Sequence, residues 1–206
     1  MIIECFGLPG VGKSTIAAGL AARLPAELVG ITGRRELLAL NLRAFLRHPV
    51  GYVRRTLWAF HEPGSRDLQL YKLRYVFLPR NATVEKAARY PLAVVDEGHL
   101  SNILSAFESP LSESRLLAEL RRLALPDLAL RVTLPHEERK RRLERRGHHS
   151  RSSEPGAYHE RWESAMEMNS EQLVRVLPRL GVRCLDVDGE LPIDELVTSV
   201  REALTR

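Results

Sequence analysis

A glycine-rich segment near the start of the chain carries the residue types that bind phosphate groups. It fits the pattern G-x-x-x-x-G-K-[ST] in full, and its residues are Gly7, Leu8, Pro9, Gly10, Val11, Gly12, Lys13, Ser14 and Thr15. Glycines allow the backbone to pass close to a phosphate, and successive N–H groups then point toward it. A helix that begins near Lys13 would also direct the positive end of its dipole at the anion. The segment therefore predicts a binding site for the phosphates of a nucleotide.

The side chains at the end of this segment have distinct expected roles. We expect Lys13 to reach the β- and γ-phosphates and so to be catalytic, Ser14 to ligate Mg²⁺, and Thr15 to contact the α-phosphate. The expected cofactors are ATP and Mg²⁺, although the motif does not distinguish ATP from GTP. The residues that we assign to nucleotide binding are Gly7, Gly10, Val11, Gly12, Lys13, Ser14 and Thr15.

Two acidic residues, Asp96 and Glu97, follow an apolar stretch over residues 92–95. In a parallel sheet, acids at such a strand end face the place where ligands bind. Asp96 could hold Mg²⁺ through water or accept a proton from the acceptor, and Glu97 could do the same or activate water. Together with the phosphate-binding segment, the pair predicts a metal site of Ser14, Asp96 and Glu97, with Asp96 also a catalytic candidate.

The net charge of +5 is concentrated in residues 139–151, which hold seven basic groups and one acidic group. A charge confined to one segment favours a local phosphate site over a long nucleic-acid footprint, so nucleic acid is an unlikely partner. A helix over 136–146 would place Arg139, Arg142 and Arg146 on one face. We interpret 139–157 as a lid region in which Arg142, Arg146 and Arg151 stabilise a transferred phosphoryl group. The alternative is an exposed helix whose cationic end complements its dipole.

Hydrophobic patterning predicts five short strands that alternate with helices. The strands are expected at 2–6, 27–31, 92–96, 128–134 and 182–187, and the helices at 13–24, 113–124, 136–146, 157–177 and 192–204. This alternation is typical of an α/β protein with a parallel sheet covered by helices on both faces. A chain of 206 residues suits one such domain, 1–206.

The stretch 34–91 is longer than a single crossover requires and is rich in aromatic residues. We expect a mostly helical lobe inserted between the second and third strands, where it would bind an acceptor. The aromatic side chains either pack the lobe onto the sheet or stack on the ring of the acceptor. The candidates for substrate contact in this lobe are Trp58, Tyr71 and Tyr75.

Several classes of protein are disfavoured by the composition. No apolar run approaches the roughly 20 residues that span a bilayer, and the apolar start of the chain is too short for a signal peptide. We therefore expect a cytoplasmic protein without a membrane partner. Cys5 and Cys184 both fall in expected buried strands. In the strand order given below, another strand lies between them, which puts them beyond disulfide reach, so both are predicted to be reduced.

The order of these motifs resembles the P-loop nucleoside and nucleotide kinases, and the layout is closest to that of thymidylate kinases. The resemblance covers nearly the whole chain. It rests on the phosphate-binding segment, the acidic strand end, and the following further segments: Arg34-Arg35-Glu36, 126–134 leading into 139–146, and 185–189 before the last helix. It implies a five-stranded parallel sheet in the order 2-3-1-4-5, a helical acceptor lobe and an arginine-bearing lid.

The resemblance also implies roles for individual residues. Arg34, Arg35 and Glu36 stand near the Arg-Glu-Pro turn with which thymidylate kinases touch the acceptor, although Leu37 replaces the proline. Glu97 stands where they have an arginine that binds an acceptor phosphate. The missing arginine favours a hydroxyl acceptor, which needs a general base. Deoxynucleoside kinases use a glutamate near the end of strand two, so Glu36 is a candidate beside Asp96. By position, 189–191 would contact the base of the donor.

Several functions are compatible with these motifs. The first is an ATP-dependent kinase that transfers the γ-phosphate to a nucleoside, a nucleotide or a similar small acceptor. The second is a kinase for a sugar, an antibiotic or another hydroxyl compound. A kinase for polynucleotide 5′ ends would need a basic track beyond the lid, and none is visible. The last is an NTPase switch that transfers no phosphate. Clustered arginines favour the transferases. The sequence also allows the protein to form a homodimer.

Overall fold

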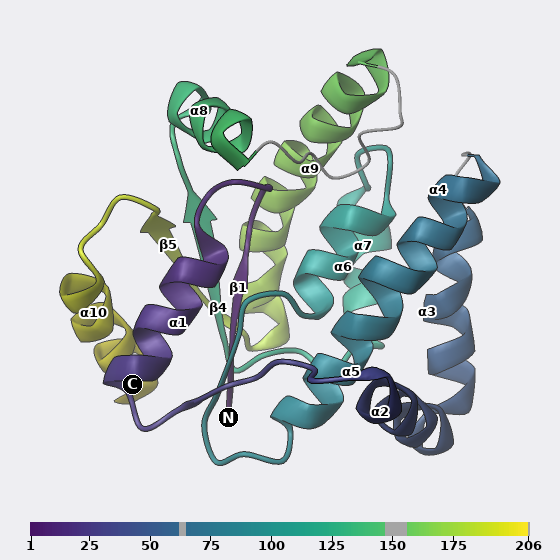
Figure 1. Ribbon diagram of the computed structural model, residues 1–206, viewed down its shortest axis with the longest axis horizontal. Coiled ribbons are helices and arrows are strands. Elements are labelled where there is room, and N and C mark those ends of the chain that lie inside the picture. Colours follow the sequence, from purple (N-terminus) through teal and green to yellow (C-terminus); the bar gives the residue numbers. More distant parts are fainter. Residues whose placement is uncertain (62–64, 147–155, 206) are drawn as a thin grey trace.

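A parallel sheet of five strands forms the centre of the molecule in a computed structural model, which describes residues 1–61, 65–146 and 156–205 (Figure 1). The strands are β1 (Ile2–Phe6), β2 (Glu27–Leu28), β3 (Ala93–Val95), β4 (Leu128–Thr133) and β5 (Arg183–Asp188). Their order is β2-β3-β1-β4-β5, and each neighbouring pair is parallel. This confirms the fold class predicted from the sequence and the strand order that the family resemblance implies.

Helices cover both faces of the sheet. Buried side chains of α1 (Lys13–Arg23) and α10 (Ile193–Thr205) pack on one face. The other face packs against α6 (His99–Ala106), α7 (Glu113–Leu120) and α9 (Gly156–Val176). Because both faces are covered, the central strands β1, β3 and β4 are mostly apolar; the exceptions are the buried Glu4 and, toward the end of β4, Arg131 and Thr133. The predicted helices are confirmed to within a few residues, and α6 is an additional helix that the pattern does not reveal.

The inserted segment folds as the expected helical lobe beside β2 and β3. It consists of α2 (Arg34–Arg47), α3 (Pro49–His61), α4 (Arg66–Tyr71), the π-helix η1 (Lys72–Phe77) and α5 (Leu78–Ala87). Figure 1 shows this lobe on the side of the sheet away from α1 and α10. Leu68, Val76 and Phe77 are buried, so the lobe contributes part of the core.

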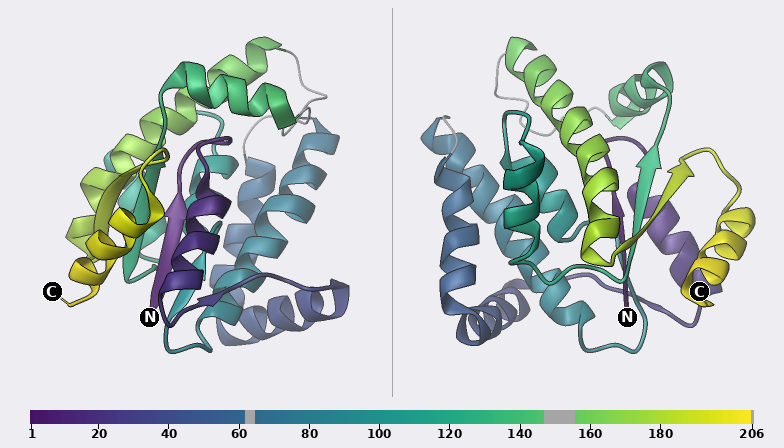
Figure 2. Two further views of the ribbon diagram at one scale, coloured as in Figure 1. Left: turned by 60° about the vertical axis from the view of Figure 1, so that its left-hand side comes forward. Right: turned by 180° about the vertical axis from the view of Figure 1, so that it is seen from behind.

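The arginine-rich helix α8 (His136–Arg146) follows β4 and lies beyond the carboxyl ends of β1 and β4 (Figure 2). The short 3-10 helix η2 (Leu177–Leu180) joins α9 to β5. Residues 147–155, which include Arg151 and most of the predicted lid loop, lie outside the described part of the chain. The roles predicted for the lid and for Arg151 therefore stay predictions.

Two local expectations need correction. Strand β2 covers only Glu27–Leu28 rather than 27–31, because it pairs with just Ala93 and Val94 of the short strand β3, which ends at Val95. Cys184 is half-buried rather than buried, since β5 is the opposite edge strand. Both cysteines are free, and β4 lies between their strands as predicted. Within the described residues, none of the helices is both long and apolar enough to cross a membrane.

Candidate functional site

The phosphate-binding segment connects β1 directly to α1, as its sequence pattern predicts. Gly7 has a φ of +142°, and a Cβ atom there would lie 2.4 Å from the carbonyl oxygen of Val132 on β4. Any side chain at this position would therefore force the turn away from the sheet. Gly12, with a φ of +100°, immediately precedes α1. The N-terminus of this helix thus points into the loop and can face an anion.

Lys13 lies beneath the loop and is 8% exposed. Its Nζ atom donates hydrogen bonds to the carbonyl oxygens of Gly7 and Leu8, both at 3.0 Å. The same atom lies 3.9 Å from Oε1 of Glu97. Burial lowers the pKa of Lys13, against the opposing effect of Glu97. The ammonium group is therefore held between the loop and an acidic side chain, within the cavity that the loop borders.

Ser14 and Asp96 come together at the start of α1, although 82 residues separate them in the sequence. The Ser14 hydroxyl donates to Oδ2 of Asp96 over 3.0 Å. A hydroxyl and a carboxylate beside a phosphate loop are the oxygen ligands that suit Mg²⁺, which takes its remaining ligands from phosphates and water. The residues thus fit the metal that the sequence predicts. Glu97, the third predicted ligand, instead faces Arg80.

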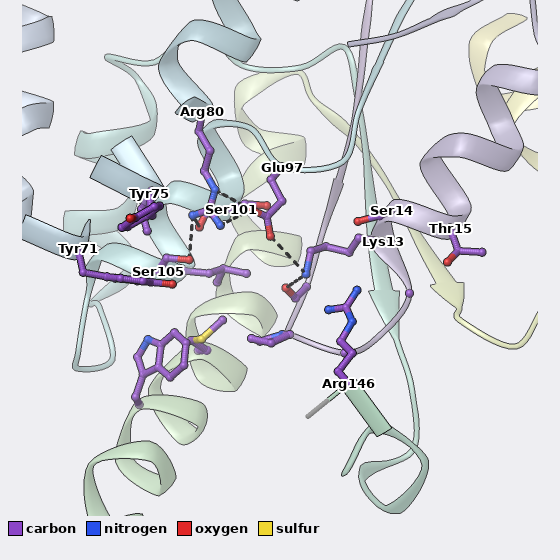
Figure 3. A pocket seen from close by; sticks show the side chains of 18 residues that line it. Lys13, Ser14, Thr15, Tyr71, Tyr75, Arg80, Glu97, Ser101, Ser105 and Arg146 are labelled. Carbon is purple, nitrogen blue, oxygen red and sulfur yellow. Dashed lines mark hydrogen bonds and ion pairs between the residues drawn. The ribbon is translucent and has the colours of Figure 1, made fainter. Parts of the chain in front are cut away.

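Glu97 joins the phosphate loop to the helical lobe. Its Oε2 atom accepts hydrogen bonds from Nε of Arg80 at 3.0 Å and from Nη2 of Arg80 at 2.5 Å. Burial would raise the pKa of Glu97, but the positive charges of Arg80 and Lys13 outweigh it, and the pKa lies below its ordinary value. Figure 3 shows the Glu97 carboxylate between these two cations. The side chain is therefore an ionised carboxylate next to the phosphate-binding lysine.

A cavity of about 190 Å³ extends from the phosphate loop into the lobe (Figure 3). Its wall is partly aromatic and apolar, with Tyr71, Tyr75, Val76, Leu104, Trp162 and Met166. The rings of Tyr71 and Tyr75 are 5.3 Å apart at a tilt of 39°. Polar groups come from Arg80, Ser101 and Ser105 on two helices. Aromatic walls with a few convergent polar groups are typical of sites for small ring compounds.

The arginines of α8 divide into two groups. Arg146 lines the cavity, and Nη1 of Arg142 would lie 3.4 Å from a Cβ atom on Gly12, so both approach the phosphate loop. Arg142 also donates to Glu138 over 2.9 Å. Arg139 was expected on the same face, but it is 3% exposed and pairs with Glu163 of α9 at 2.9 Å. Arg139 therefore fixes α8 to α9 instead of facing a ligand.

The turn at the end of β2 is not brought to this cavity. Glu36 accepts hydrogen bonds from the backbone and side chain of Thr32 and pairs with Lys86 at 2.8 Å. Lys86 and Thr32 lower the pKa of Glu36 to about 2. Arg34 and Arg35 are exposed and are not among the residues that line the cavity. The acceptor roles predicted for this turn therefore stay predictions, because none of its residues lines the cavity. The side chain of Trp58 lies outside the described part of the structure.

Arg80 is the main site residue that the sequence analysis misses. While its Nε and Nη2 atoms donate to Glu97, its Nη1 atom donates to the Ser101 carbonyl at 3.0 Å and to the Ser105 hydroxyl at 2.9 Å. It lies inside the lobe with no motif around it, so no spacing marks it.

Glu4 is a second missed residue, on β1 three positions before Gly7. Its fully buried Oε1 atom accepts from the backbone N–H groups of Gly98, Leu100 and Ser101, at 3.1, 2.8 and 3.1 Å. Burial raises the pKa of Glu4 to about 7, against the lowering effect of these hydrogen bonds. The carboxyl thus anchors the N-terminus of α6, and with it the turn that carries Asp96 and Glu97, to β1. A lone acid within an apolar strand was the signal.

The sheet order and the phosphate loop together define a P-loop protein with the fold of nucleoside and nucleotide kinases. More particularly, the chain belongs to a family whose model is described as an AAA domain and matches residues 2–169. Among curated proteins, no sequence matches the chain.

Solved structures agree with this fold. A deoxyadenosine kinase from M. mycoides with the products dCMP and a flexible dCDP aligns with 100% of this chain and 99% of its own, at 16% identity and a TM-score of 0.56. The same kinase with bound dATP aligns over 100% of both chains, at 16% identity and a TM-score of 0.56. The YorR protein of Bacillus subtilis in complex with phosphorylated GDP aligns with 100% of this chain and 96% of its own, at 16% identity and a TM-score of 0.50.

Proposed function

We propose that the protein is an ATP-dependent phosphotransferase that moves the γ-phosphate to a hydroxyl group of a nucleoside or a similar small ring compound. The observation that carries the proposal is the position of Glu97. Its carboxylate lies 3.9 Å from Nζ of Lys13 on one side and contacts Arg80 at the floor of an aromatic cavity on the other. A hydroxyl held in this cavity would meet a base and a phosphoryl group at one place.

The phosphate loop and its lysine would bind the donor. Backbone N–H groups and Lys13 hold the phosphates, while Ser14 and Asp96 would hold Mg²⁺, which when bound neutralises phosphate charge. Arg142 and Arg146 approach the same loop from α8 and would stabilise charge on the transferred group. In this arrangement Glu97 accepts the proton of the acceptor hydroxyl, a role for which the sequence left Asp96, Glu97 and Glu36 as candidates.

The bonding of Arg80 favours a hydroxyl over a phosphate acceptor. All three of its guanidinium nitrogens donate to protein groups, namely Glu97, Ser101 and Ser105. Because these hydrogen bonds use four of its five N–H groups, Arg80 is poorly placed to bind an acceptor phosphate as well. The aromatic wall with Tyr71, Tyr75 and Trp162 suits a flat ring. The likeness to a deoxyadenosine kinase agrees with a nucleoside.

Transfer of labelled phosphate tests this function. The protein is incubated with Mg²⁺ and γ-labelled ATP or GTP, against nucleosides, nucleoside monophosphates, sugars and hydroxylated antibiotics. We expect label on a nucleoside, lost in Lys13→Ala and retained in Lys140→Ala, an exposed lysine of α8. Label on sugars or antibiotics alone would replace the acceptor class. Slow hydrolysis that no acceptor accelerates would contradict transfer and favour an NTPase switch.

A further inference from the structure

A second cavity, of about 340 Å³, lies at the end of the sheet opposite the phosphate loop. It is enclosed by α2, α3, α5, the start of α6 and the residues that follow α7. Ile2, the first residue of β1, contributes to its wall, whereas the phosphate loop follows the last residue of that strand. The two ends of such a strand are about 13 Å apart. None of its lining residues belongs to the candidate site already described.

A buried arginine without a carboxylate faces this cavity. Arg55 is 9% exposed, and its Nη1 atom donates to the carbonyl oxygen of Arg122 over 3.2 Å. Among the described residues, its Nε atom is buried without a hydrogen-bond partner, and no acidic side chain lies within 4.0 Å. Burial accordingly lowers the pKa of Arg55. A buried cation is costly unless an anion compensates it. Arg55 has no such anion among the described residues, so a bound anion would stabilise it.

The wall of the cavity carries an excess of positive charge. Arg47, Arg55, Arg121 and Arg122 line it against one carboxylate, that of Glu85. Arg47 pairs with Glu85 at 2.9 Å, and Arg122 pairs with Glu119 at 3.4 Å. In the described part of the chain, Arg55 and Arg121 have no ion pair. Two guanidinium groups therefore remain to bind an anion, for which their fork of donors is well suited.

Uncharged polar groups with unused hydrogen-bonding capacity border the same space. Asn81 is 2% exposed, and within the described residues neither its Nδ2 nor its Oδ1 atom has a partner. His99 is 4% exposed, and its buried Nδ1 atom likewise lacks a partner there. Burial and the charge of Arg55 lower the pKa of His99 to about 3, so the ring is neutral. Buried polar groups are normally satisfied, so these atoms are available to hydrogen-bond a group in the cavity.

We propose that this cavity, formed around Arg55, Arg121 and Asn81, is a binding site for a small phosphate-bearing anion. Arg55 and Arg121 would bind the phosphate oxygens, and the Asn81 amide would donate to a further oxygen. Its volume lies at the lower end of the range for small-molecule sites, which suits a pyrophosphate or a small phosphate ester rather than a large nucleotide. The site is independent of the phosphate loop, and the proposal does not rest on kinase activity.

Calorimetric titration with inorganic pyrophosphate in metal-free buffer tests the proposal. The titration uses Lys13→Ala protein, in which the phosphate loop is weakened, so that the second site dominates. We expect one pyrophosphate per chain, and a loss of affinity of tenfold or more on adding either Arg55→Met or Arg121→Gln. Arg175→Gln, an exposed arginine of α9, serves as the matched control and should bind as its parent does. Citrate should bind at least tenfold more weakly, which separates phosphate from carboxylate recognition.

Thermal unfolding without ligand separates binding from structure. In the Lys13→Ala protein, replacing the uncompensated Arg55 by Met should leave the melting temperature without ligand equal or higher. Pyrophosphate should no longer raise the melting temperature of this double variant. A large fall in the melting temperature of Arg55→Met, with an unchanged pyrophosphate response in Arg121→Gln, would show that Arg55 is structural and would overturn the proposal. Equal affinity in Lys13→Ala and both double variants would overturn it as well, as would tighter binding of citrate than of pyrophosphate.

Discussion

Glu97 is the residue on which the proposed chemistry depends. Glu97→Gln retains the shape and an acceptor for Arg80 but cannot take a proton. Loss of a general base reduces turnover by about 10²- to 10⁴-fold, and we expect kcat to fall in this range with a smaller change in KM. Glu36→Gln should leave kcat nearly unchanged, because Glu36 is held by Lys86 and Thr32 outside the cavity. Steady-state kinetics on the acceptor found by labelling measures both. The reverse pattern would return the base to Glu36.

Arg80 should set the pH at which this carboxylate becomes active. Arg80 and Lys13 keep the pKa of Glu97 below its ordinary value, despite burial, so the base remains ionised into the acidic range. Activity that needs the carboxylate is lost as the pH falls through that pKa. In Arg80→Met the pKa rises, so the acidic limb of the profile of kcat/KM against pH should move to higher pH. Arg34→Met removes an exposed arginine and should not move the limb; a shift in both, or in neither, would contradict this role.

The junction of β1 with α6 is the clearest contact between elements that shapes the site. Glu4 joins them through hydrogen bonds from three backbone N–H groups, and its folded-state pKa of about 7 exceeds the unfolded value of 4.5. The folded protein therefore retains a proton that the unfolded chain releases between these values. The stability from protonated Glu4 is complete below pH 4.5 and is lost as the pH rises through 7.

Glu4→Gln should remove this dependence on pH. Relative to the variant, the free energy of unfolding of the wild type should fall by about 3 kcal/mol between pH 4.5 and 7.5, since each pKa unit corresponds to about 1.4 kcal/mol. Urea unfolding at a series of pH values measures the difference. Glu27→Gln, an exposed acid of β2, should run parallel to the wild type. Parallel curves for Glu4→Gln as well would show that Glu4 is not protonated on folding.

The elements were more predictable than the contacts between them. The strands and the phosphate loop follow from local patterns, namely apolar runs and a glycine-rich turn before a helix, whereas the strand order came from the family resemblance. Helical spacing also placed Arg142 and Arg146 near the loop, yet it could not show that α9 would bury Arg139 against Glu163. Arg80 reaches Glu97 only because the lobe packs beside β3, a long-range contact without a sequence pattern. The sequence thus indicated Tyr71 and Tyr75, which line the cavity, but not the Arg80–Glu97 contact beside them.

At the scale of the whole molecule, the phosphate site is built from the same elements as the core. Its loop joins β1 to α1, and Asp96 follows β3, so a nucleotide bound there contacts elements that unfold with the sheet. A ligand that binds only the folded state stabilises it by about 2.7 kcal/mol at a hundredfold excess over Kd. For a chain of 206 residues this corresponds to a rise in melting temperature of about 5–10 °C.

The size of this rise, and its dependence on metal, test how the donor is held. With ATP and Mg²⁺ we expect the full rise, and a smaller one with ATP and EDTA, because Ser14 and Asp96 then lack the ion that joins them to the phosphates. Asp96→Asn should show the smaller rise under both conditions, and Lys13→Ala almost none. Differential scanning calorimetry with ATP and with GTP compares the donors directly. A full rise in Asp96→Asn with Mg²⁺ would exclude Asp96 from the metal site, and a larger rise with GTP would reassign the donor.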